Sequence, residues 1–224
     1  MILQFTNPVQ GGLRQERKLE MIANHLANVD TSGFKSDMVT FDQLLRSEMG
    51  IDFSPGPLKT TGNALDVALD GDGFFKVRTA RGERYTRNGN FTLNAENLLV
   101  TATGSPVMGE GGEITIEGRD IQINREGEIV VDGALVDKLA VVNFESRQKM
   151  AKDGDSLFVG PTDSPEISVE TPVVHQGALE GSNVEAVVDM TRMIEVMRTY
   201  EALQKMIQAY DETDGRIISE VGKE

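Results

Sequence analysis

Apolar residues near both ends of the chain recur at the three- and four-residue spacing of an α-helix. From about residue 10 to 30, Leu19, Ile22, Leu26 and Val29 form one narrow stripe along a helix. Towards the other end, a long stripe consists of Met193, Val196, Tyr200, Leu203, Ile207, Tyr210 and Ile217, interrupted by Asp214, and a shorter stripe consists of Val187, Met190, Ile194 and Met197. A helix that reaches about residue 219 is about 55 Å long at 1.5 Å per residue, and such a seam requires a partner helix.

Turn-forming residues mark where these two helices are expected to end and begin. After the first helix, Gly33 suits a stop in the left-handed conformation, and Thr31–Ser32 belongs to the same turn. Before the second helix, Ser182–Asn183 predicts an N-terminal cap. Glu185 and Asp189 then lie early in the helix, where negative charge is favourable.

Between about residues 64 and 172 the pattern changes to short apolar alternations separated by glycine and aspartate. Asn88-Gly89 lies between two alternating runs and predicts a tight β-hairpin. Residues 121–131 predict a second hairpin with the longer loop Asn124–Gly127, and Ile121, Ile123, Ile129 and Val131 share alternating faces. Further strands are predicted at EITI, LAVVNF and EISVE, residues 113–116, 139–144 and 166–170. The middle of the chain is therefore expected to be an antiparallel β structure.

Composition excludes several classes of protein. The net charge of −14 disfavours binding to nucleic acid, and an anionic membrane would repel the chain. No run approaches 18 consecutive apolar residues, and the first residues lack the basic and apolar regions of a cleavable signal peptide. The chain has no cysteine, which excludes disulfides and thiolate metal sites. We therefore expect no nucleic-acid partner and no direct membrane insertion.

The motifs that carry chemistry are incomplete. The segment from Asp70 begins like a calcium-binding EF-hand loop, but its sixth position is Phe75 and its twelfth is Arg81. The segment from Asp153 also fails, with Ser164 where the bidentate glutamate should be. No dinucleotide- or phosphate-binding glycine loop is complete. We expect no cofactor and no metal.

The two histidines, His25 and His175, have no partner at ligand spacing, and no nucleophile motif accompanies them. His25 is interpreted as a contact or surface residue of the first helix. A carboxylate-based enzyme that uses two paired acids stays open as an alternative, because the chain has 36 Asp and Glu. A calcium-binding β-protein also stays open. We expect no catalytic residues.

Asn24 and Asn28 occupy one line of the first helix, because they are four residues apart. An amide both donates and accepts hydrogen bonds, so it can satisfy the backbone of a neighbouring subunit where a buried charge would be costly. We interpret the two residues as part of an assembly contact.

Five blocks of the sequence resemble the flagellar rod and hook protein family. NHLAN (24–28) followed by TSGFK (31–35) is similar to the ANNLAN-x-x-T-x-GFK signature of that family, with His25 in place of an asparagine. TGNALDVALDGDGFFKV, YTRNGNFTL, LLVTATGSPVMG and GALEGSNVEAVVDM resemble the other blocks in the family's order, and together they cover most of the chain. Within the family, the length favours a rod protein over the hook protein. The connection FDQLLRSEMGIDFSPGPLKTTGN (41–63) and the tail RTYEALQKMIQAYDETDGRI (198–217) look most like a proximal rod protein, and a distal rod protein stays as the alternative.

The resemblance implies an α+β fold in which the N- and C-terminal helices pair as a coiled coil around an antiparallel β-rich middle. It implies a helical terminal domain of residues 1–35 plus 179–224 and a β-rich domain of residues 36–178. The implied function is a structural subunit of the bacterial flagellar basal-body rod that transmits torque. Its partners would be other rod proteins, further copies of itself and the flagellar type III export apparatus, with assembly in the periplasm. The expected interface residues are Leu19, Ile22, Asn24, Leu26, Asn28, Val29, Thr31, Gly33, Phe34, Met193, Val196, Tyr200, Leu203, Ile207 and Tyr210.

Overall fold

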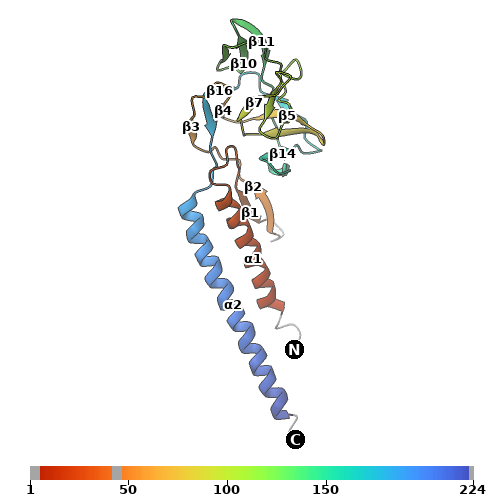
Figure 1. Cartoon of the computed structure of the whole chain (residues 1–224). Coiled ribbons are helices and arrows are strands. Elements are labelled where there is room, and N and C mark those ends of the chain that lie inside the picture. The colour runs from red at the N-terminus through yellow and green to blue at the C-terminus, as the bar shows by residue number, and fades with distance from the viewer. Residues whose placement is uncertain (1–5, 42–46, 222–224) are drawn as a thin grey trace. The chain divides into compact units, whose positions relative to one another are not determined.

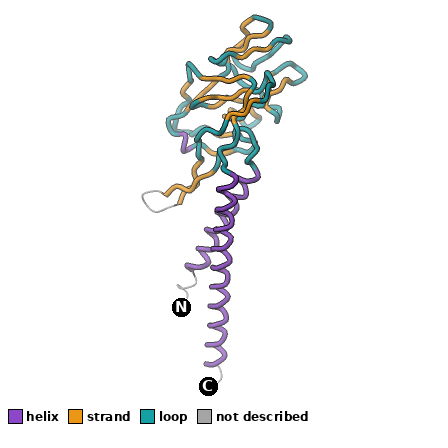
Figure 2. The backbone as a smooth tube through the Cα atoms, turned by 90° about the vertical axis from the view of Figure 1, so that its left-hand side faces the viewer, coloured by secondary structure: helices purple, strands orange, loops and turns teal. Residues whose placement is uncertain are grey.

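The computed structural model of the chain describes residues 6–41 and 47–221 (Figure 1). It divides into two compact units, a helical unit of Met1–Ala27 with Glu185–Glu224 and a β unit of Asn28–Val184. Figure 2 shows that the long helices belong to one unit and the strands to the other. This arrangement confirms the α+β class and the β-rich antiparallel middle. No helix in the described ranges has the length and apolar character needed to cross a membrane.

The helical unit contains α1 (Thr6–Ala27) and α2 (Ala186–Val221), so both predicted helices are confirmed. The two helices lie antiparallel and side by side (Figures 1 and 2). Gly11 of α1 lies against Leu203 of α2, and His25 contacts Asp189 nearer the start of α2. The side chains of Asp214 and Ile217, which the apolar pattern included, lie outside the described residues.

The β unit is built from antiparallel strand pairs. Its largest sheet has the order β13-β14-β6-β5-β12-β15, and a three-stranded sheet has the order β11-β10-β9. The six-stranded sheet consists of β5 (Phe74–Thr79), β6 (Gly82–Thr86), β12 (Val141–Asn143), β13 (Ala151–Lys152), β14 (Leu157–Val159) and β15 (Ile167–Ser168). The three-stranded sheet consists of β9 (Ile121–Ile123), β10 (Glu128–Val131) and β11 (Ala134–Lys138).

The remaining strands form two-stranded pairs, β1 with β2, β4 with β16, β3 with β17 and β7 with β8. Their bounds are β1 (Asp37–Phe41), β2 (Ser47–Ile51), β3 (Leu58–Thr60), β4 (Val67–Asp70), β7 (Phe91–Leu93), β8 (Leu99–Thr101), β16 (Val173–Gln176) and β17 (Ala178–Glu180), and the short 3-10 helix η2 spans Arg147–Lys149. The pairs of β3 with β17 and β4 with β16 join residues near the beginning of the unit to residues near its end.

Two hydrophobic clusters form the core of the β unit. The larger cluster includes Phe75 and Ile129 and draws on the six-stranded and three-stranded sheets. The smaller cluster is mostly aromatic, and in it Phe53, Phe74 and Phe158 contact one another edge to face at centroid distances of 5.4 to 5.8 Å. Tyr85 and Phe144 of the same cluster also contact each other edge to face, at a centroid distance of 4.8 Å.

The predicted hairpin at Asn88-Gly89 is wrong. β6 pairs with β5 and β14, whereas β7, which follows the Asn-Gly pair, pairs with β8. The segment between them carries the chain from one sheet to another, and the carbonyl of Gly89 accepts a hydrogen bond from the amide of Val67 at 3.0 Å. A Cβ at Gly89 would lie 1.7 Å from the carbonyl oxygen of Val67, so the glycine is required for close backbone approach.

The hairpin predicted at residues 121–131 is confirmed. Ile129 pairs with Ile123 across the loop Asn124–Gly127, and both isoleucines are buried in the larger cluster. The pattern missed the next turn, Asp132-Gly133, where φ is +49° and +84° and which joins β10 to β11. Strands are confirmed within LAVVNF and EISVE, but EITI forms only isolated bridges, although Ile114 and Ile116 of that segment are buried.

The predicted cap of the second helix is also wrong. α2 begins at Ala186, and the amide of Asp189 donates to the carbonyl of Glu185 at 2.9 Å. The side chains of Ser182–Asn183 instead bond to backbone atoms of the β unit. The segment cannot cap the helix because its polar atoms already have these partners.

Gly33 has the predicted left-handed conformation, with φ of +68°, but it does not terminate a helix. α1 ends six residues earlier at Ala27, and the amide of Gly33 donates to the carbonyl of Glu180 at 2.8 Å. A Cβ at this position would lie 2.3 Å from the backbone nitrogen of Asn88. The glycine therefore permits three backbone segments of the β unit to meet.

Gly33→Ala should destabilise the β unit far more than the matched change Gly62→Ala. Both glycines have positive φ, which costs an alanine roughly 1 to 2 kcal/mol. Only at Gly33 would the new methyl group also overlap backbone, because nothing lies within 4 Å of a Cβ at Gly62. Urea denaturation of the purified variants measures the difference. Equal losses of unfolding free energy would contradict the close approach at Gly33.

Candidate functional site

One line of α2 faces α1 and forms what we call the seam: Met193, Val196, Tyr200, Leu203 and Ile207. Each of these side chains is half-buried, whereas most of their neighbours along the helix are exposed. Tyr210, which continues the line, is largely exposed. The spacing of four and three residues keeps the seam on one side of the helix over about 20 Å.

Two glycines of α1 allow the helices to approach closely at the seam. A Cβ on Gly11 would lie 3.4 Å from Leu203 Cδ1, and one on Gly12 would lie 4.0 Å from the Tyr200 ring. Neither residue was predicted from the sequence, because a glycine contributes nothing to an apolar pattern. The predicted residues of α1 lie nearer its other end, where Ile22 is buried and Leu19 and Leu26 are half-buried.

A buried polar contact joins the same two helices. His25 Nδ1 lies 3.1 Å from Asp189 Oδ2, and both side chains are almost completely buried. Arg192, one turn along α2, donates to the other oxygen of Asp189 at 3.0 Å. His25 is therefore a contact residue between α1 and α2. Asp189 has the negative charge expected in the first turn, but it is used for a side-chain contact.

The predicted residues after α1 belong to the β unit. Thr31 Oγ1 donates to Asn28 Oδ1 at 3.2 Å, and the amide of Thr31 donates to the carbonyl of Asn28 at 3.1 Å. Phe34 is buried, and Lys152 Nζ lies 4.6 Å from the centre of its ring. Asn24 is exposed on α1, and Val29 is half-buried in the β unit. The predicted set is therefore divided between the two units.

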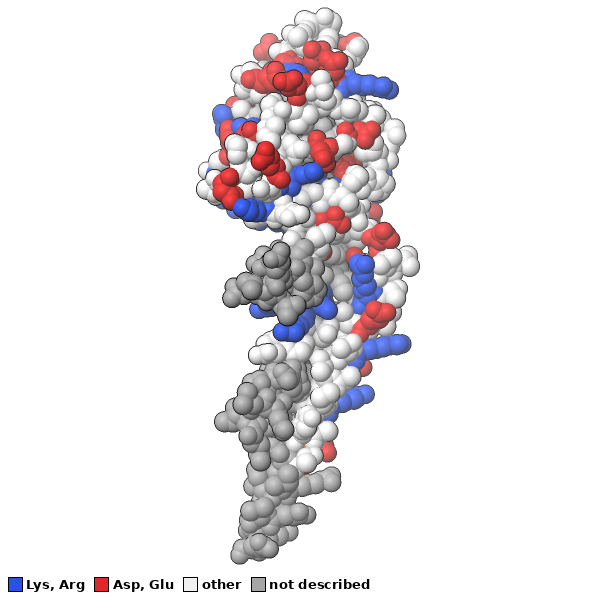
Figure 3. All heavy atoms as spheres, turned by 180° about the vertical axis from the view of Figure 1, so that it is seen from behind, with Lys and Arg blue, Asp and Glu red and all other residues white. Residues whose placement is uncertain are grey.

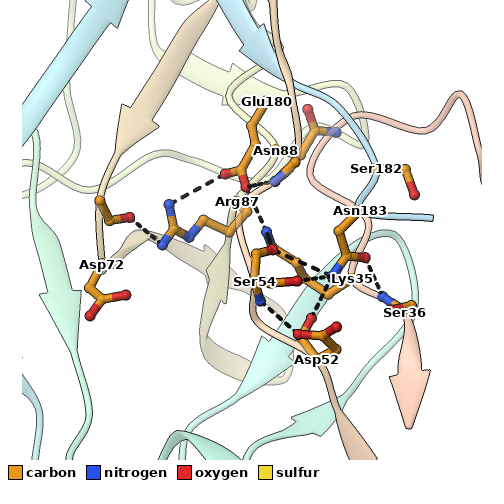
Figure 4. Close-up of polar contacts among 12 residues, drawn as sticks. Lys35, Ser36, Asp52, Ser54, Asp72, Arg87, Asn88, Glu180, Ser182 and Asn183 are labelled. Carbon is orange, nitrogen blue, oxygen red and sulfur yellow. Dashed lines mark hydrogen bonds and ion pairs between the residues drawn. The ribbon is translucent and has the colours of Figure 1, made fainter. Parts of the chain in front are cut away.

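The boundaries of the units differ from the division drawn from the sequence, which assigned residues 28–35 and 179–184 to the helical domain. Both segments pack within the β unit. The physical reason is a buried ion triad of Lys35, Arg87 and Glu180 (Figure 4). Lys35 Nζ lies 2.6 Å from Glu180 Oε1, and Arg87 Nη1 lies 3.3 Å from Glu180 Oε2. The three side chains are 0, 3 and 1% exposed for Lys35, Arg87 and Glu180 respectively.

Backbone groups complete the triad and connect it to distant parts of the unit. Lys35 Nζ also donates to the carbonyl of Ser54 at 2.7 Å, and Arg87 Nη2 donates to the carbonyl of Gly71 at 2.6 Å. Glu180 Oε1 accepts a hydrogen bond from the amide of Gly56 at 2.9 Å. Figure 4 shows Lys35 and Glu180 converging from the segment that follows α1 and the segment that precedes α2. The triad thus ties together the points where the chain enters and leaves the β unit.

The triad has an excess of positive charge, because one carboxylate is paired with two cations. Burial lowers the pKa of Lys35, and the hydrogen bond to Glu180 opposes this shift. Burial also lowers the pKa of Arg87. Arg87 Nε is buried without a hydrogen-bond partner among the residues described. Glu180 is therefore the one group in the triad that compensates the buried positive charge.

In the acidic segments that resemble calcium-binding loops, aspartate side chains form ion pairs with arginines. Asp72 accepts hydrogen bonds from both terminal nitrogens of Arg147 at 2.5 and 2.9 Å, and this contact lowers the pKa of Asp72. Asp153 binds Arg81 and Arg84 at 2.6 and 2.5 Å. In the part of the chain described, no three His, Asp or Glu side chains are placed to hold a metal ion.

A fragment of residues 28–184 should unfold cooperatively and be more stable than a fragment of residues 36–178. The shorter fragment removes Lys35 and Glu180 together and leaves Arg87 buried without its carboxylate. Circular dichroism during thermal unfolding measures both fragments. A shorter fragment with an unchanged melting temperature would show that the triad does not hold the β unit together.

Three family models match the chain. "Flagella basal body rod protein" matches residues 11–35, "Flagellar hook protein FlgE/F/G D1 domain" matches residues 68–131, and "Flagellar basal body rod FlgEFG protein C-terminal" matches residues 175–220. The first and third cover most of α1 and α2, and the second covers the strands from β4 to β10.

Curated relatives match along almost the whole chain. The flagellar basal-body rod protein FlgF of Caulobacter vibrioides is 37% identical over 92% of this chain and 93% of its own length. FlgF of Salmonella typhimurium is 35% identical, with coverage of 87% and 88%. The rod protein FlgG of Bacillus subtilis is 29% identical, with coverage of 95% and 96%.

Proposed function

The chain belongs to the family of flagellar basal-body rod proteins, and we propose that it is a structural subunit of the proximal part of the rod. As a rod subunit it assembles with other components of the hook-basal body complex. The proximal assignment is supported by identities of 37% and 35% to two FlgF proteins, compared with 29 to 32% to three FlgG proteins; two further FlgF proteins are each 30% identical. The distal rod protein is the runner-up.

The observation that supports this function most strongly is an apolar line on α2 that is exposed to solvent. While the seam faces α1, a second apolar line of the same helix lies in water, and Val187, its first residue, is 78% exposed. The other members of this line, Met190, Ile194 and Met197, are also exposed. An isolated chain gains nothing from such a surface, whereas an assembly buries it against neighbouring subunits.

We propose that α1 and α2 pair as a coiled coil. The seam follows the four-three spacing of a heptad repeat, and Gly11 and Gly12 allow a close approach opposite Leu203 and Tyr200. The buried contact of His25 with Asp189 fixes the register, because sliding one helix along the other would separate the pair. A fixed register is useful in a shaft that transmits torque.

The remaining features agree with a building block that has no catalytic role. In the two segments that resemble calcium-binding loops, Asp72 is paired with Arg147, and Asp153 is paired with Arg81 and Arg84. We further propose export through the flagellar type III apparatus, followed by assembly in the periplasm. The absence of cysteine is compatible with this route, since no disulfide has to form after export.

Deleting the gene for this chain should abolish swimming, and supplying the chain from a plasmid should restore it. A subunit of a continuous rod cannot be bypassed, so the rod should not extend beyond the missing position. The measurements are motility in soft agar and the composition of purified basal bodies. Swimming cells that lack the chain, or basal bodies that do not contain it in the complemented strain, would overturn the proposed function.

A further inference from the structure

The edge strand β11 presents an apolar surface to solvent. β11 pairs with β10 and is the last strand in the order β11-β10-β9. Leu135 is 64% exposed and Val136 is 43% exposed, and Val130, which pairs opposite Leu135, is half-buried. We call Val130, Leu135 and Val136 the β11 patch. Exposed edges are usually protected by charged residues, so an apolar edge in a chain this rich in charge requires an explanation.

The chain itself covers only one end of this edge. The amide of Glu110 donates to the carbonyl of Lys138 at 2.9 Å, and the amide of Gly111 donates to Asp137 Oδ1 at 3.1 Å. Ala134 and Leu135, in contrast, pair only with β10 among the described strands, and Val136 falls at the bulge where the register of this pairing shifts. The apolar end of β11 is therefore the end that its own chain leaves open.

Carboxylates surround the patch. Residues 110–138, which end at the last residue of β11, contain eight Asp and Glu but only three Lys and Arg. Glu128 lies two positions before Val130 on the same face of β10, and Asp132 lies in the turn that leads to β11. Figure 3 shows Asp and Glu gathered at the end of the β unit that holds β10 and β11. The whole β unit has 25 Asp and Glu against 14 Lys and Arg, so its own surface repels a second copy of the same surface.

We infer that the β11 patch is a docking surface for a different protein, whose contact face has an apolar side chain flanked by Lys and Arg. An apolar centre contributes affinity, and an acidic rim selects a basic partner and rejects acidic ones. Contact between two copies through this patch is disfavoured because it would bring the two acidic rims together. The inference rests on the proposed function only in that the partner is sought within the basal body.

The test places a photo-crosslinking amino acid at Leu135 of the full chain in cells that lack the native copy. A second strain has the same amino acid at Leu58, which is exposed on strand β3 and serves as the matched control. Basal bodies are purified after irradiation, and adducts are identified by mass spectrometry. We expect an adduct from position 135 with a polypeptide other than this chain, through a segment that contains Lys or Arg.

Adding Val136→Lys should reduce that adduct roughly tenfold, because the ammonium would meet a basic partner. No adduct at position 135, an adduct with a second copy, an adduct through an acidic segment, or a yield unaffected by Val136→Lys would each overturn the inference. Its failure is distinguishable from failure of the proposed function. If the chain is present in the basal bodies without this adduct, the inference alone is wrong; if the chain is absent from them, the proposed function is wrong.

Discussion

Glu180→Gln should lower the free energy of unfolding of the β unit by about 3 to 5 kcal/mol. The substitution conserves shape but removes the carboxylate that compensates Lys35 and Arg87, both of which are almost completely buried. Two cations would then remain in the interior at hydrogen-bond distance from a neutral amide. Urea denaturation of the purified chain, monitored by far-ultraviolet circular dichroism, measures the loss.

The matched control is Glu113→Gln, which breaks an exposed ion pair with Arg78 at 3.1 Å. This change should alter the free energy of unfolding by no more than about 1 kcal/mol. Replacing Lys35, Arg87 and Glu180 together by apolar residues of similar length should recover much of the stability, since no buried charge would remain. Similar effects of Glu180→Gln and Glu113→Gln would contradict the compensating role of Glu180.

The triad also predicts a dependence of stability on pH. Because burial lowers the pKa of Lys35 in the folded chain, the unfolded chain binds more protons between that lowered pKa and the ordinary value of 10.5. The contribution of Lys35 to the free energy of unfolding therefore rises as pH increases through this window. Comparison of the wild type with Lys35→Met isolates the effect, and the variant should lack this part of the rise.

Leu203→Asp should abolish swimming while leaving the melting of the β unit unchanged. Leu203 lies against Gly11 in the middle of the seam, so a carboxylate there would be desolvated without a partner. The cost to the pairing of α1 with α2 should be several kcal/mol. A charge at Ile207, farther along the seam, should act in the same direction. Ala202→Asp is the matched control, because Ala202 is adjacent in sequence and exposed.

The helices were predictable because their apolar residues follow a simple period over a long distance. The seam from Met193 to Ile207 was identified residue by residue, and the structure places these side chains on the side of α2 that faces α1. Gly11 and Gly12 were missed because they contribute only their small size to the helix contact. A small residue adds nothing to a pattern of apolar positions. The role of the seam in assembly stays a prediction, as does the role of Asn24 and Asn28.

The β unit was harder to predict because its strand pairing is set by contacts between residues far apart in the chain. Asn88-Gly89 has the composition of a tight hairpin turn, but the close approach of Val67 to Gly89 assigns it to a crossing between sheets. The ion triad was missed for a related reason. Lys35 and Glu180 are separated by 145 positions, and each alone is an ordinary charged residue that would be expected on the surface.

The role of the seam is tested most directly by the amount of this chain in basal bodies purified from cells that express wild type, Leu203→Asp or Ala202→Asp. Levels inside the cell and in the exported fraction serve as controls for folding, stability and export. The wild type and Ala202→Asp should be incorporated normally, whereas Leu203→Asp should show little or no incorporation at equal exported levels. Normal incorporation of Leu203→Asp, with normal swimming, would show that pairing of α1 with α2 through the seam is not required for this subunit to enter the rod.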